Sequence, residues 1–334
     1  MKPKVYFPGS LYVSYEIARP ILEPEVDVVM FPNKILSAEQ LAEAFHDVDG
    51  AIVTRFENVS RSLLEAAPRL RVLSKFGVGI ETVDLEAATE LGIPVTNCPG
   101  VNALSVAELT MALMFSLLRH LPKLDSLVRQ GDWTTSKRLF GGDIEGSTLG
   151  LIGIGNVGRL VAERASAMGM RVIAYDPYQS AEYVAKTGAK KVDSLDDLLP
   201  VADFVSLHAT VTKENRRMLG ETEFRKMKPT AYLINTARSL LVDQDAMLRA
   251  LKEHRIAGAA IDAHEQEPLP VNDPLLQLDN VLLTPHHGGT TDRTRERTLK
   301  QACSNLLSML SGNIPDVGLC NPAVRDRFKQ KWDR

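Results

Sequence analysis

The sequence predicts an α/β protein built from two parallel sheets, each covered by helices. Short apolar runs rich in β-branched residues alternate with helical patterns along most of the chain. The alternation forms two series, and a polar, glycine-rich stretch at 131–148 precedes the second one. The length of 334 residues also favours two domains.

The first hundred residues contain five strand candidates with helical segments between them. The helix expected at 37–45 begins with the N-cap residue Ser37, and the helix expected at 60–66 is followed by Pro68. Strands that alternate with helices form parallel sheets with both faces covered. The five candidates are KVYF (4–7), VDVVM (26–30), AIVT (51–54), RVLS (71–74) and IPVT (93–96).

A helical spacing of apolar residues follows, from 102 to about 130, and it predicts one long helix. The apolar run at 111–118 is far shorter than the roughly 20 residues that a membrane span needs. We therefore expect it to be buried in the protein. The apolar face of the predicted helix comprises Val106, Leu109, Leu113, Leu117 and Leu121.

The second series predicts a larger, doubly wound sheet. A helix is expected at 292–310, and the short polar tail after it is expected to pack on the first sheet. Both ends of the chain then form the smaller domain, residues 1–101 and 288–334, and residues 102–287 form the larger one. The six strand candidates are 149–153, 171–176, 203–208, 231–235, 257–262 and 281–285.

Charge and cysteine content restrict the expected partners. The 39 Lys and Arg residues against 42 Asp and Glu residues leave a net charge of −3 without a basic tract, so no nucleic-acid partner is expected. Pro8 and Gly9 interrupt the N-terminus before a signal peptide can form, and no membrane partner is expected. Cys98, Cys303 and Cys320 are too scattered for a disulfide framework or a metal site, which favours a cytoplasmic protein with buried thiols.

A G-x-G-x-x-G hexapeptide at 153–158 lies between an apolar strand candidate and an apolar helical segment. Such a turn brings the backbone close to a pyrophosphate, and the N–H groups at the start of the helix favour the phosphate charge. Asp176 ends the next strand candidate, where a carboxylate can accept both ribose hydroxyls and would repel a 2′-phosphate. The pattern predicts NAD rather than NADP. FAD is an alternative, but its fingerprint usually lies near the start of a chain.

Three later segments, 235–238, 262–268 and 284–289, place ionisable groups at the ends of strand candidates. The carboxyl ends of strands face the ligand crevice in a doubly wound sheet. Arginine can bind a carboxylate through two hydrogen bonds, and histidine can exchange a proton with a reacting oxygen. A carboxylate beside the histidine orients it and favours its protonated form. These groups suit the interconversion of a 2-oxo acid and a 2-hydroxy acid, with the hydride carried by the cofactor.

Taken together, these motifs resemble the D-isomer-specific 2-hydroxyacid dehydrogenases, the family of phosphoglycerate dehydrogenase, hydroxypyruvate and glyoxylate reductases and D-lactate dehydrogenase. The resemblance spans nearly the whole chain, because KFGVG (75–79), NCPG (97–100) and SVAE (105–108) also agree in order and spacing. It implies a Rossmann-type, doubly wound NAD-binding domain inserted into a smaller flavodoxin-like substrate domain. It also implies a homodimer through the NAD-binding domain, with the helix 102–121 and the arm 131–146 as the expected interface.

The resemblance further implies roles for individual residues. Arg238 is the expected binder of the substrate carboxylate and carbonyl, His286 the acid/base and Glu267 its partner. The amides around Val78 and Gly79 are expected to hold the substrate carboxylate. The residues expected at the cofactor are Gly153, Gly155, Asn156, Val157, Gly158, Asp176, Ala237, Asp262, His286 and Gly288. No metal is expected.

Neighbouring residues compete for two of these roles. His287 competes with His286, and Glu265 competes with Glu267. The family pattern of His, an apolar residue and Gly-Gly selects His286, and the Glu-Pro pair of the family selects Glu267. His264 departs from the pattern, because the family usually has an aromatic residue there.

Other positions bear on the cofactor and the substrate. Asp262 is expected at the nicotinamide carboxamide, and His208 is expected to be structural or to lie at the edge of the cofactor. In the segment 55–57, the charge of Glu57 is expected to disfavour a phosphate nearby, whereas Arg55 or Phe56 could meet a carboxylate or an apolar side chain.

Two alternative functions accompany this interpretation. A formate-dehydrogenase-like enzyme is disfavoured, because an amide is expected there in place of Glu267. An NAD(H)-sensing, corepressor-like protein of the same fold would retain Arg238, Glu267 and His286, so measured turnover distinguishes it from a dehydrogenase.

Overall fold

The structure is a computed structural model, and it describes residues 2–9, 13–31 and 36–332. Its residues divide into two compact units. Unit 1 comprises Met1–Asn102 and Thr290–Arg334, and unit 2 comprises Ala103–Gly289. The first boundary between the units lies one residue later in the chain than we expect from the sequence, and the second boundary lies two residues later.

The described part of unit 1 contains a five-stranded parallel sheet with the order β2-β1-β3-β4-β5. This is the 2-1-3-4-5 order of flavodoxin-like sheets. Nearly all residues of β1, β3, β4 and β5 are buried, whereas the edge strand β2 is half-buried to exposed. The strands are β1 (Lys4–Phe7), β2 (Asp27–Met30), β3 (Gly50–Val53), β4 (Val72–Lys75) and β5 (Val95–Thr96).

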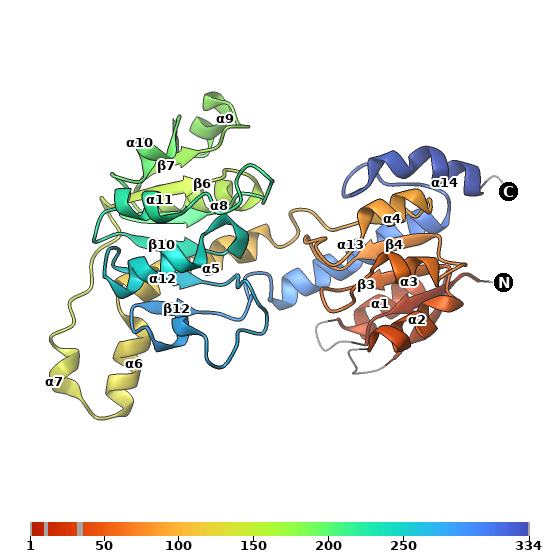
Figure 1. The fold of residues 1–334 in the computed structure, drawn as a ribbon, viewed down its shortest axis with the longest axis horizontal. Coiled ribbons are helices and arrows are strands. Elements are labelled where there is room, and N and C mark those ends of the chain that lie inside the picture. The colour runs from red at the N-terminus through yellow and green to blue at the C-terminus, as the bar shows by residue number, and fades with distance from the viewer. Residues whose placement is uncertain (1, 10–12, 32–35, 333–334) are drawn as a thin grey trace. The chain divides into compact units, whose positions relative to one another are not determined.

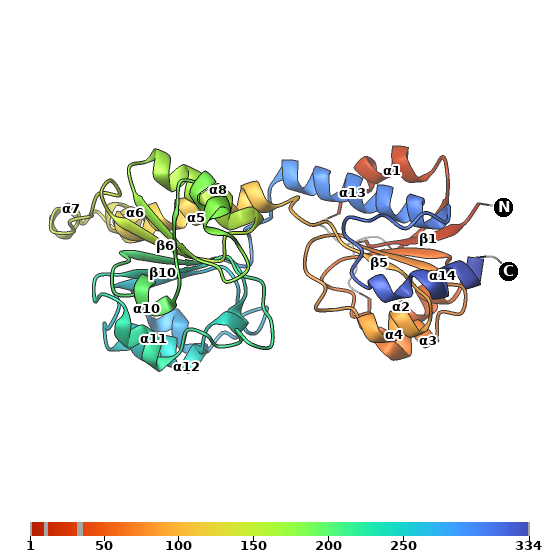
Figure 2. The ribbon, with the colours of Figure 1, turned by 90° about the horizontal axis from the view of Figure 1, so that it is seen from above.

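Helices cover both faces of the sheet of unit 1, as Figure 2 shows from the side. One apolar layer joins α1 and α13 to the sheet, and another joins α2, α3 and α4 to the opposite face. The helix predicted at 292–310 is confirmed by α13, and Ser37 forms a capping box with Gln40 at the start of α2. The helices are α1 (Tyr15–Leu22), α2 (Ala38–His46), α3 (Arg61–Glu65), α4 (Leu85–Glu90) and α13 (Asp292–Leu310).

The C-terminal segment packs on unit 1, as expected. Leu319 forms an antiparallel bridge with Thr96. The side chain of Asn321 accepts a hydrogen bond from the amide of Val95 at 2.9 Å. After this segment, α14 (Arg325–Trp332) buries Phe328.

Glu57 is buried in unit 1 and serves the turn after β3. Its Oε2 accepts hydrogen bonds from both the amide and the hydroxyl of Thr54, each at 2.6 Å. The hydroxyl of Tyr6 donates to Oε1 at 3.5 Å. The side chain is therefore engaged by the fold, and its proposed effect on a substrate phosphate stays a prediction.

The described part of unit 2 contains a seven-stranded parallel sheet with the order β12-β11-β10-β9-β6-β7-β8. Counted from β6, this is the 3-2-1-4-5-6 order of dinucleotide-binding sheets with one additional strand, and the order reverses between β6 and β9. The strands are β6 (Thr148–Ile152), β7 (Arg171–Tyr175), β8 (Lys190–Val192), β9 (Phe204–Leu207), β10 (Tyr232–Asn235), β11 (Gly258–Ile261) and β12 (Val281–Leu283).

The sequence predicts six strands for this sheet, one fewer than the seven in the structure. The missing strand is β8, a three-residue edge strand that contains Lys190 and Lys191. It has no apolar run, and its pairing with β7 alone defines it as a strand.

Helices also cover both faces of the sheet of unit 2 (Figures 1 and 2). Apolar residues of α5 and α8 pack on one face, and those of α10, α11 and α12 pack on the other. These helices are α5 (Ala103–Leu118), α8 (Asn156–Ala167), α10 (Leu195–Leu198), α11 (Glu221–Lys226) and α12 (Gln244–Lys252). The short helix α9 (Ala181–Lys186) precedes β8.

The single long helix predicted from 102 to 130 is wrong. The chain forms α5 and α6 (Leu121–Arg129), which are bent by 59° relative to each other. His120 has the left-handed φ of 51°, and Pro122 lies in the first turn of α6, because proline lacks the N–H that a continuous helix requires. Leu121 is accordingly half exposed rather than part of the buried face.

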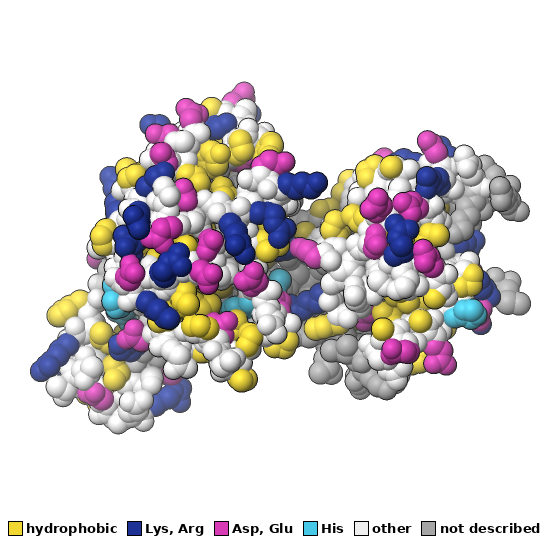
Figure 3. All heavy atoms as spheres, in the orientation of Figure 1, with side chains coloured by type: hydrophobic (Ala, Val, Ile, Leu, Met, Phe, Trp, Pro, Cys, Tyr) yellow, Lys and Arg dark blue, Asp and Glu magenta, His cyan; other side chains and the backbone are white. Residues whose placement is uncertain are grey.

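Within the described residues, no single helix has the length and apolar composition needed to cross a membrane. Only the bent pair of α5 and α6 meets these two criteria together, and α5 is largely buried inside unit 2. On the face drawn in Figure 3, basic and acidic side chains lie interspersed.

Candidate active site

The glycine-rich turn after β6 packs tightly against the end of β9. Gly153 has a φ of 93°, and a Cβ there would lie 2.6 Å from the amide nitrogen of Ala209. A Cβ at Gly158 would lie 2.3 Å from the carbonyl oxygen of Gly153. Both glycines are therefore required by close backbone contacts of the turn.

Gly155 differs from these two glycines, because a Cβ there would meet no described atom within 4 Å. It is the N-cap residue of α8, and no side chain caps this helix or places a negative charge in its first turn. Open space in front of free helical N–H groups suits a pyrophosphate. Gly155, Asn156 and Val157 could therefore hold this part of NAD.

Asp176 lies directly after β7 and is 9% exposed. Its Oδ2 accepts a hydrogen bond from the amide of Ile154 at 2.9 Å, so the carboxylate is anchored to the glycine-rich turn. Its Oδ1 accepts another from the amide of Tyr178 at 2.9 Å. An ionised carboxylate has about four acceptor positions, so capacity remains for ribose hydroxyls. The residues of the turn and Asp176 together fit NAD.

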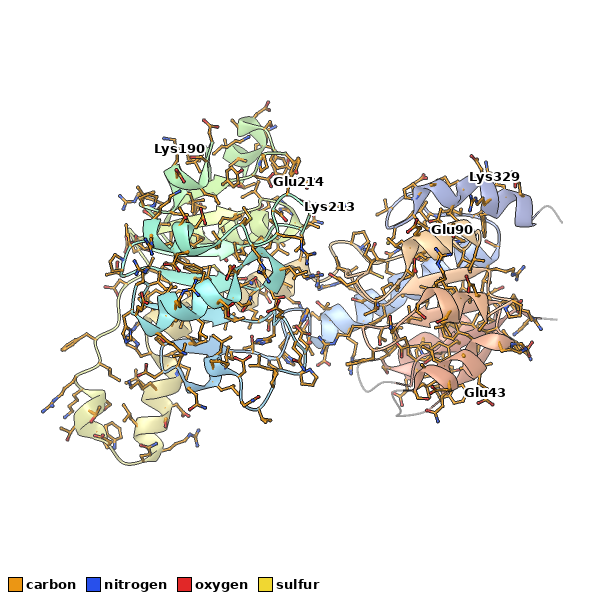
Figure 4. All side chains as sticks on the ribbon, in the orientation of Figure 1. Glu43, Glu90, Lys190, Lys213, Glu214 and Lys329 are labelled. Atoms are coloured by element: carbon orange, nitrogen blue, oxygen red, sulfur yellow. The ribbon has the colours of Figure 1, made fainter. Side chains whose placement is uncertain are left out.

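His208 follows β9 and lies close to the same turn, with its Cβ 3.5 Å from a Cβ built at Gly158. Its Nε2 forms a hydrogen bond with the hydroxyl of Ser206 at 2.9 Å. Burial lowers the pKa of His208 to about 3, so the ring is neutral at physiological pH. Further along this loop, Lys213 and Glu214 project into solvent (Figure 4).

His286 and Glu267 form a direct pair in unit 2. Nδ1 of His286 lies 2.7 Å from Oε1 and 2.9 Å from Oε2 of Glu267. A carboxylate can only accept, so Nδ1 carries the proton in this pair and Nε2 is left for proton exchange. The side chain of His286 is 36% exposed, which leaves room for a reacting group.

The neighbouring residues do not form such a pair. His287 donates to an acidic side chain through its backbone amide, which lies 2.6 Å from Oδ1 of Asp262. Glu265 is exposed. Of the two histidines and two glutamates, the structure therefore brings together His286 and Glu267.

Asp262 lies directly after β11 and anchors the loop that carries His286. Its side chain accepts hydrogen bonds from the hydroxyl of Thr284 at 2.6 Å, the amide of His287 at 2.6 Å and the amide of Gly288 at 2.9 Å. The residue is 2% exposed. Three of about four acceptor positions are thus used inside the protein. A contact with the nicotinamide carboxamide stays a prediction.

Arg238 follows β10, and the buried side chain of Asn235 holds its backbone. Nδ2 of Asn235 donates to the carbonyl oxygen of Arg238 at 3.0 Å, and its Oδ1 accepts from the amide of Ala237 at 3.1 Å. The guanidinium of Arg238 is half-buried. Arg238, Glu267 and His286 come after the neighbouring parallel strands β10, β11 and β12.

Val78 and Gly79 belong to unit 1, in the turn after β4. Two hydrogen bonds hold the turn. The side chain of Asn97 donates to the carbonyl oxygen of Val78 at 2.7 Å, and the amide of Cys98 donates to the carbonyl oxygen of Gly77 at 2.8 Å. Gly77 has a φ of 127°, which favours glycine. The substrate-binding role of Val78 and Gly79 stays a prediction.

His264 is a part of the site to which the sequence assigns no role. Its amide donates to Oε1 of Glu267 at 3.3 Å, and its Nε2 bonds to the carbonyl oxygen of Thr284 at 2.8 Å. The one available signal is that histidine replaces the usual aromatic residue of the family at this position. A substitution of that kind does not reveal which loop the ring contacts.

Comparisons with known proteins agree with this architecture. Residues 111–288 match the family model "D-isomer specific 2-hydroxyacid dehydrogenase, NAD binding domain". The chain is 38% identical over 330 residues to a glyoxylate reductase of Thermofilum pendens, with 96% of this chain and 97% of the relative covered. It is 39% identical over 281 residues to a D-3-phosphoglycerate dehydrogenase of Methanocaldococcus jannaschii, with 84% of this chain but only 53% of that relative covered.

A solved structure, that of the TT0316 protein from Thermus thermophilus, is similar with a TM-score of 0.86 and 35% identity, covering 94% of this chain and 98% of that one. The fold, the fit of the turn to NAD and these similarities lead to one assignment. The chain belongs to the D-isomer-specific 2-hydroxyacid dehydrogenases and is an NAD-dependent oxidoreductase of that family.

Proposed function

We propose that this enzyme reduces a small 2-oxo acid to the D-2-hydroxy acid, with His286 as proton donor, Glu267 as its partner and Arg238 as the binder of the substrate carboxylate. The observation that carries the proposal is the hydrogen bond from Nδ1 of His286 to the carboxylate of Glu267. NADH, when bound, supplies the hydride.

The proposed proton transfer uses the nitrogen of His286 that Glu267 leaves unused. In the imidazolium form both ring nitrogens carry protons, and the negative charge of Glu267 stabilises this form. Nε2 then gives its proton to the substrate oxygen as the carbonyl carbon gains the hydride. The products are the 2-hydroxy acid, NAD and a neutral His286, which recovers a proton from solvent.

Arg238 is proposed to orient the substrate. A guanidinium presents several donors in one plane and can bind a carboxylate through two parallel hydrogen bonds. Its backbone is fixed by Asn235 at the end of β10, which limits the positions that the guanidinium can reach. At the cofactor, we propose Gly155, Asn156 and Val157 for the pyrophosphate and Asp176 for the ribose.

We propose glyoxylate as the first substrate to test, because the glyoxylate reductase of Thermofilum pendens covers nearly the whole chain. NADH and NADPH oxidation would be followed by absorbance with glyoxylate, hydroxypyruvate, pyruvate, phenylpyruvate, 2-oxoglutarate and 3-phosphohydroxypyruvate. His286→Ala should lower kcat by about 10²- to 10⁴-fold, and His287→Ala should retain most of it. Equal loss in both variants, or NADH binding without turnover of any acid, would overturn the proposal.

We also propose that two copies associate through unit 2. The described residues of α6 are not buried, and Trp133 in α7 (Trp133–Ser136) and Phe140 beyond it are 63% and 86% exposed. A hollow of about 600 Å³ beside this segment is lined by both apolar residues, such as Phe115 and Ile144, and charged ones, such as Arg119. Exposed aromatic residues beside such a hollow on one unit suit a second copy of the chain. Light scattering after size exclusion should give a dimer, and a monomer at micromolar concentration would contradict it.

A further inference from the structure

His264 connects the two loops that carry the acid/base pair. It lies in the loop of Glu267, and its ring reaches the loop of His286. We propose that His264 is a positioning residue that holds Glu267 and His286 in the geometry needed for proton transfer. This inference rests on the roles proposed above for Glu267 and His286.

The first contact acts on the carboxylate. The amide of His264 donates to Oε1 of Glu267 at 3.3 Å, and the same oxygen lies 2.7 Å from Nδ1 of His286. Rotation of the carboxylate would lengthen both bonds. The backbone of His264 therefore helps to keep Glu267 turned toward the imidazole.

The second contact acts on the backbone of His286. Nε2 of His264 donates to the carbonyl oxygen of Thr284 at 2.8 Å, and the amide of His286 donates to the same oxygen at 3.0 Å. A carbonyl can only accept, so Nε2 of His264 carries a proton. His286 has the left-handed φ of 54°, which is uncommon for a residue other than glycine. Fixing the carbonyl of Thr284 thus supports an unusual conformation at the proposed proton donor.

The remaining ring nitrogen points to the same role. Nδ1 of His264 is buried and has no hydrogen-bond partner among the described residues. A phenyl ring would lose no hydrogen bond at the position of Nδ1. At the position of Nε2, however, it would lose the donor to Thr284. The polar contact that distinguishes histidine from an aromatic hydrocarbon at this position is therefore the bond to Thr284.

Three other titratable side chains form hydrogen bonds within this set of loops. Glu267 and His286 bond each other, and Oδ1 of Asp262 accepts a hydrogen bond from the hydroxyl of Thr284. Displacement of Thr284 would therefore be transmitted both to the proton donor and to the residue that anchors its loop. We expect the main consequence in the chemical step, because the turn of Gly155 and Asp176, which is proposed to hold the pyrophosphate and ribose, lies in other loops.

The test compares His264→Phe with His264→Gln in the full-length enzyme. Both variants keep the backbone amide that bonds Glu267. Glutamine can also present an N–H donor near the position of Nε2, whereas phenylalanine cannot. We expect His264→Phe to lower kcat on the order of tenfold, with KM for NADH changed by less than about twofold. The midpoint of its pH–kcat profile should also change, and His264→Gln should restore most of both properties.

Two further variants define the outcome. His46→Phe removes an exposed histidine at the end of α2 and should match the unchanged enzyme. His264→Asn, which lacks a donor at the Nε2 position, replaces His264→Phe if circular dichroism shows that the latter does not fold. The inference would be overturned if His264→Gln were as impaired as the variant that lacks a donor at the Nε2 position, whether that variant is His264→Phe or His264→Asn.

The inference and the proposed function fail in different ways. Full activity of His286→Ala would overturn the proposed function, and the role of His264 with it. Loss of activity in His286→Ala together with an unchanged kcat and pH profile in His264→Phe would overturn the role of His264 alone.

Discussion

Nδ1 of His286 lies within hydrogen-bond distance of both carboxylate oxygens of Glu267, at 2.7 and 2.9 Å. The two residues come from different loops, 19 positions apart in the chain, and the pair depends on the parallel alignment of β11 and β12. A carboxylate at this place accepts from Nδ1 and orients the imidazole. The geometry therefore predicts which chemical property is lost when the charge is removed.

Glu267→Gln removes the charge and keeps a side chain of nearly the same size. We expect kcat for reduction of the 2-oxo acid to fall by about 100-fold, because the imidazole loses the carboxylate that accepts from Nδ1 and orients the ring. Glu43→Gln is the matched control, because Glu43 projects into solvent from α2 (Figure 4). An unchanged kcat in Glu267→Gln would contradict the role of this pair.

The glycine-rich turn allows cofactor binding to be separated from stability. A Cβ at Gly155 meets open space, so Gly155→Ala should change the free energy of unfolding by less than about 1 kcal/mol but weaken NADH binding. A Cβ at Gly158 would lie 2.3 Å from a backbone oxygen, so Gly158→Ala should also destabilise the protein by about 1–3 kcal/mol. Fluorescence titration with NADH and chemical denaturation would measure the two effects. Unweakened NADH binding in Gly155→Ala would rule out this place for the pyrophosphate.

Asp176 is expected to set the preference for NADH over NADPH. Asp176→Asn removes the charge that would repel a 2′-phosphate, so the ratio of kcat/KM for NADPH to that for NADH should rise by about tenfold or more. Some activity with NADH should also be lost, because an asparagine cannot accept from both Ile154 and Tyr178 through two oxygens. Asp316→Asn, at an exposed position of unit 1, should leave the ratio unchanged. An unaltered ratio in Asp176→Asn would assign the preference to other residues.

Lys75 should make the stability of the protein depend on pH above about 8. Burial lowers its pKa from 10.5 to about 8, and the charges of Glu57 and Glu81 oppose this shift only in part. Its Nζ donates to the carbonyl oxygen of Thr54 at 2.6 Å. The pKa is lowered in the folded state, so the unfolded chain binds more protons between about pH 8 and 10.5. The cost of burying the charge is therefore fully present below pH 8 and is relieved as the pH rises through this window.

The measurement compares the enzyme with Lys75→Met by chemical denaturation at pH 7.5, 8.5 and 9.5. The free energy of unfolding of the unchanged enzyme, relative to the variant, should rise by about 1–2 kcal/mol over this range. Lys329→Met removes a lysine that projects from α14 (Figure 4), and the free energy of unfolding of the unchanged enzyme relative to this control variant should show no such rise. A flat difference for Lys75→Met would show that Lys75 keeps an ordinary pKa in the folded protein.

The sequence alone determined the features that depend on neighbouring residues in the chain. Apolar runs located eleven of the twelve strands, and the helix expected at 292–310 has the bounds of α13. The glycine spacing at 153–158 determined the turn, because each short contact there involves backbone that only glycine can approach. Such signals are local, so they are legible before the fold is known.

Tertiary structure decided what depends on contacts between distant segments. The edge strand β8 is defined by its pairing with β7, whereas the helix break after α5 lies at Pro122, a local signal that the sequence already contains. Glu267 is paired with His286 and not with the adjacent His287, whose amide bonds Asp262 instead. Likewise, the bond of His264 to Thr284 joins two loops that lie next to each other only because β11 and β12 are parallel neighbours. Hydrogen bonds between these loops depend on the pairing of the two strands, and the spacing of residues within one segment does not reveal that pairing.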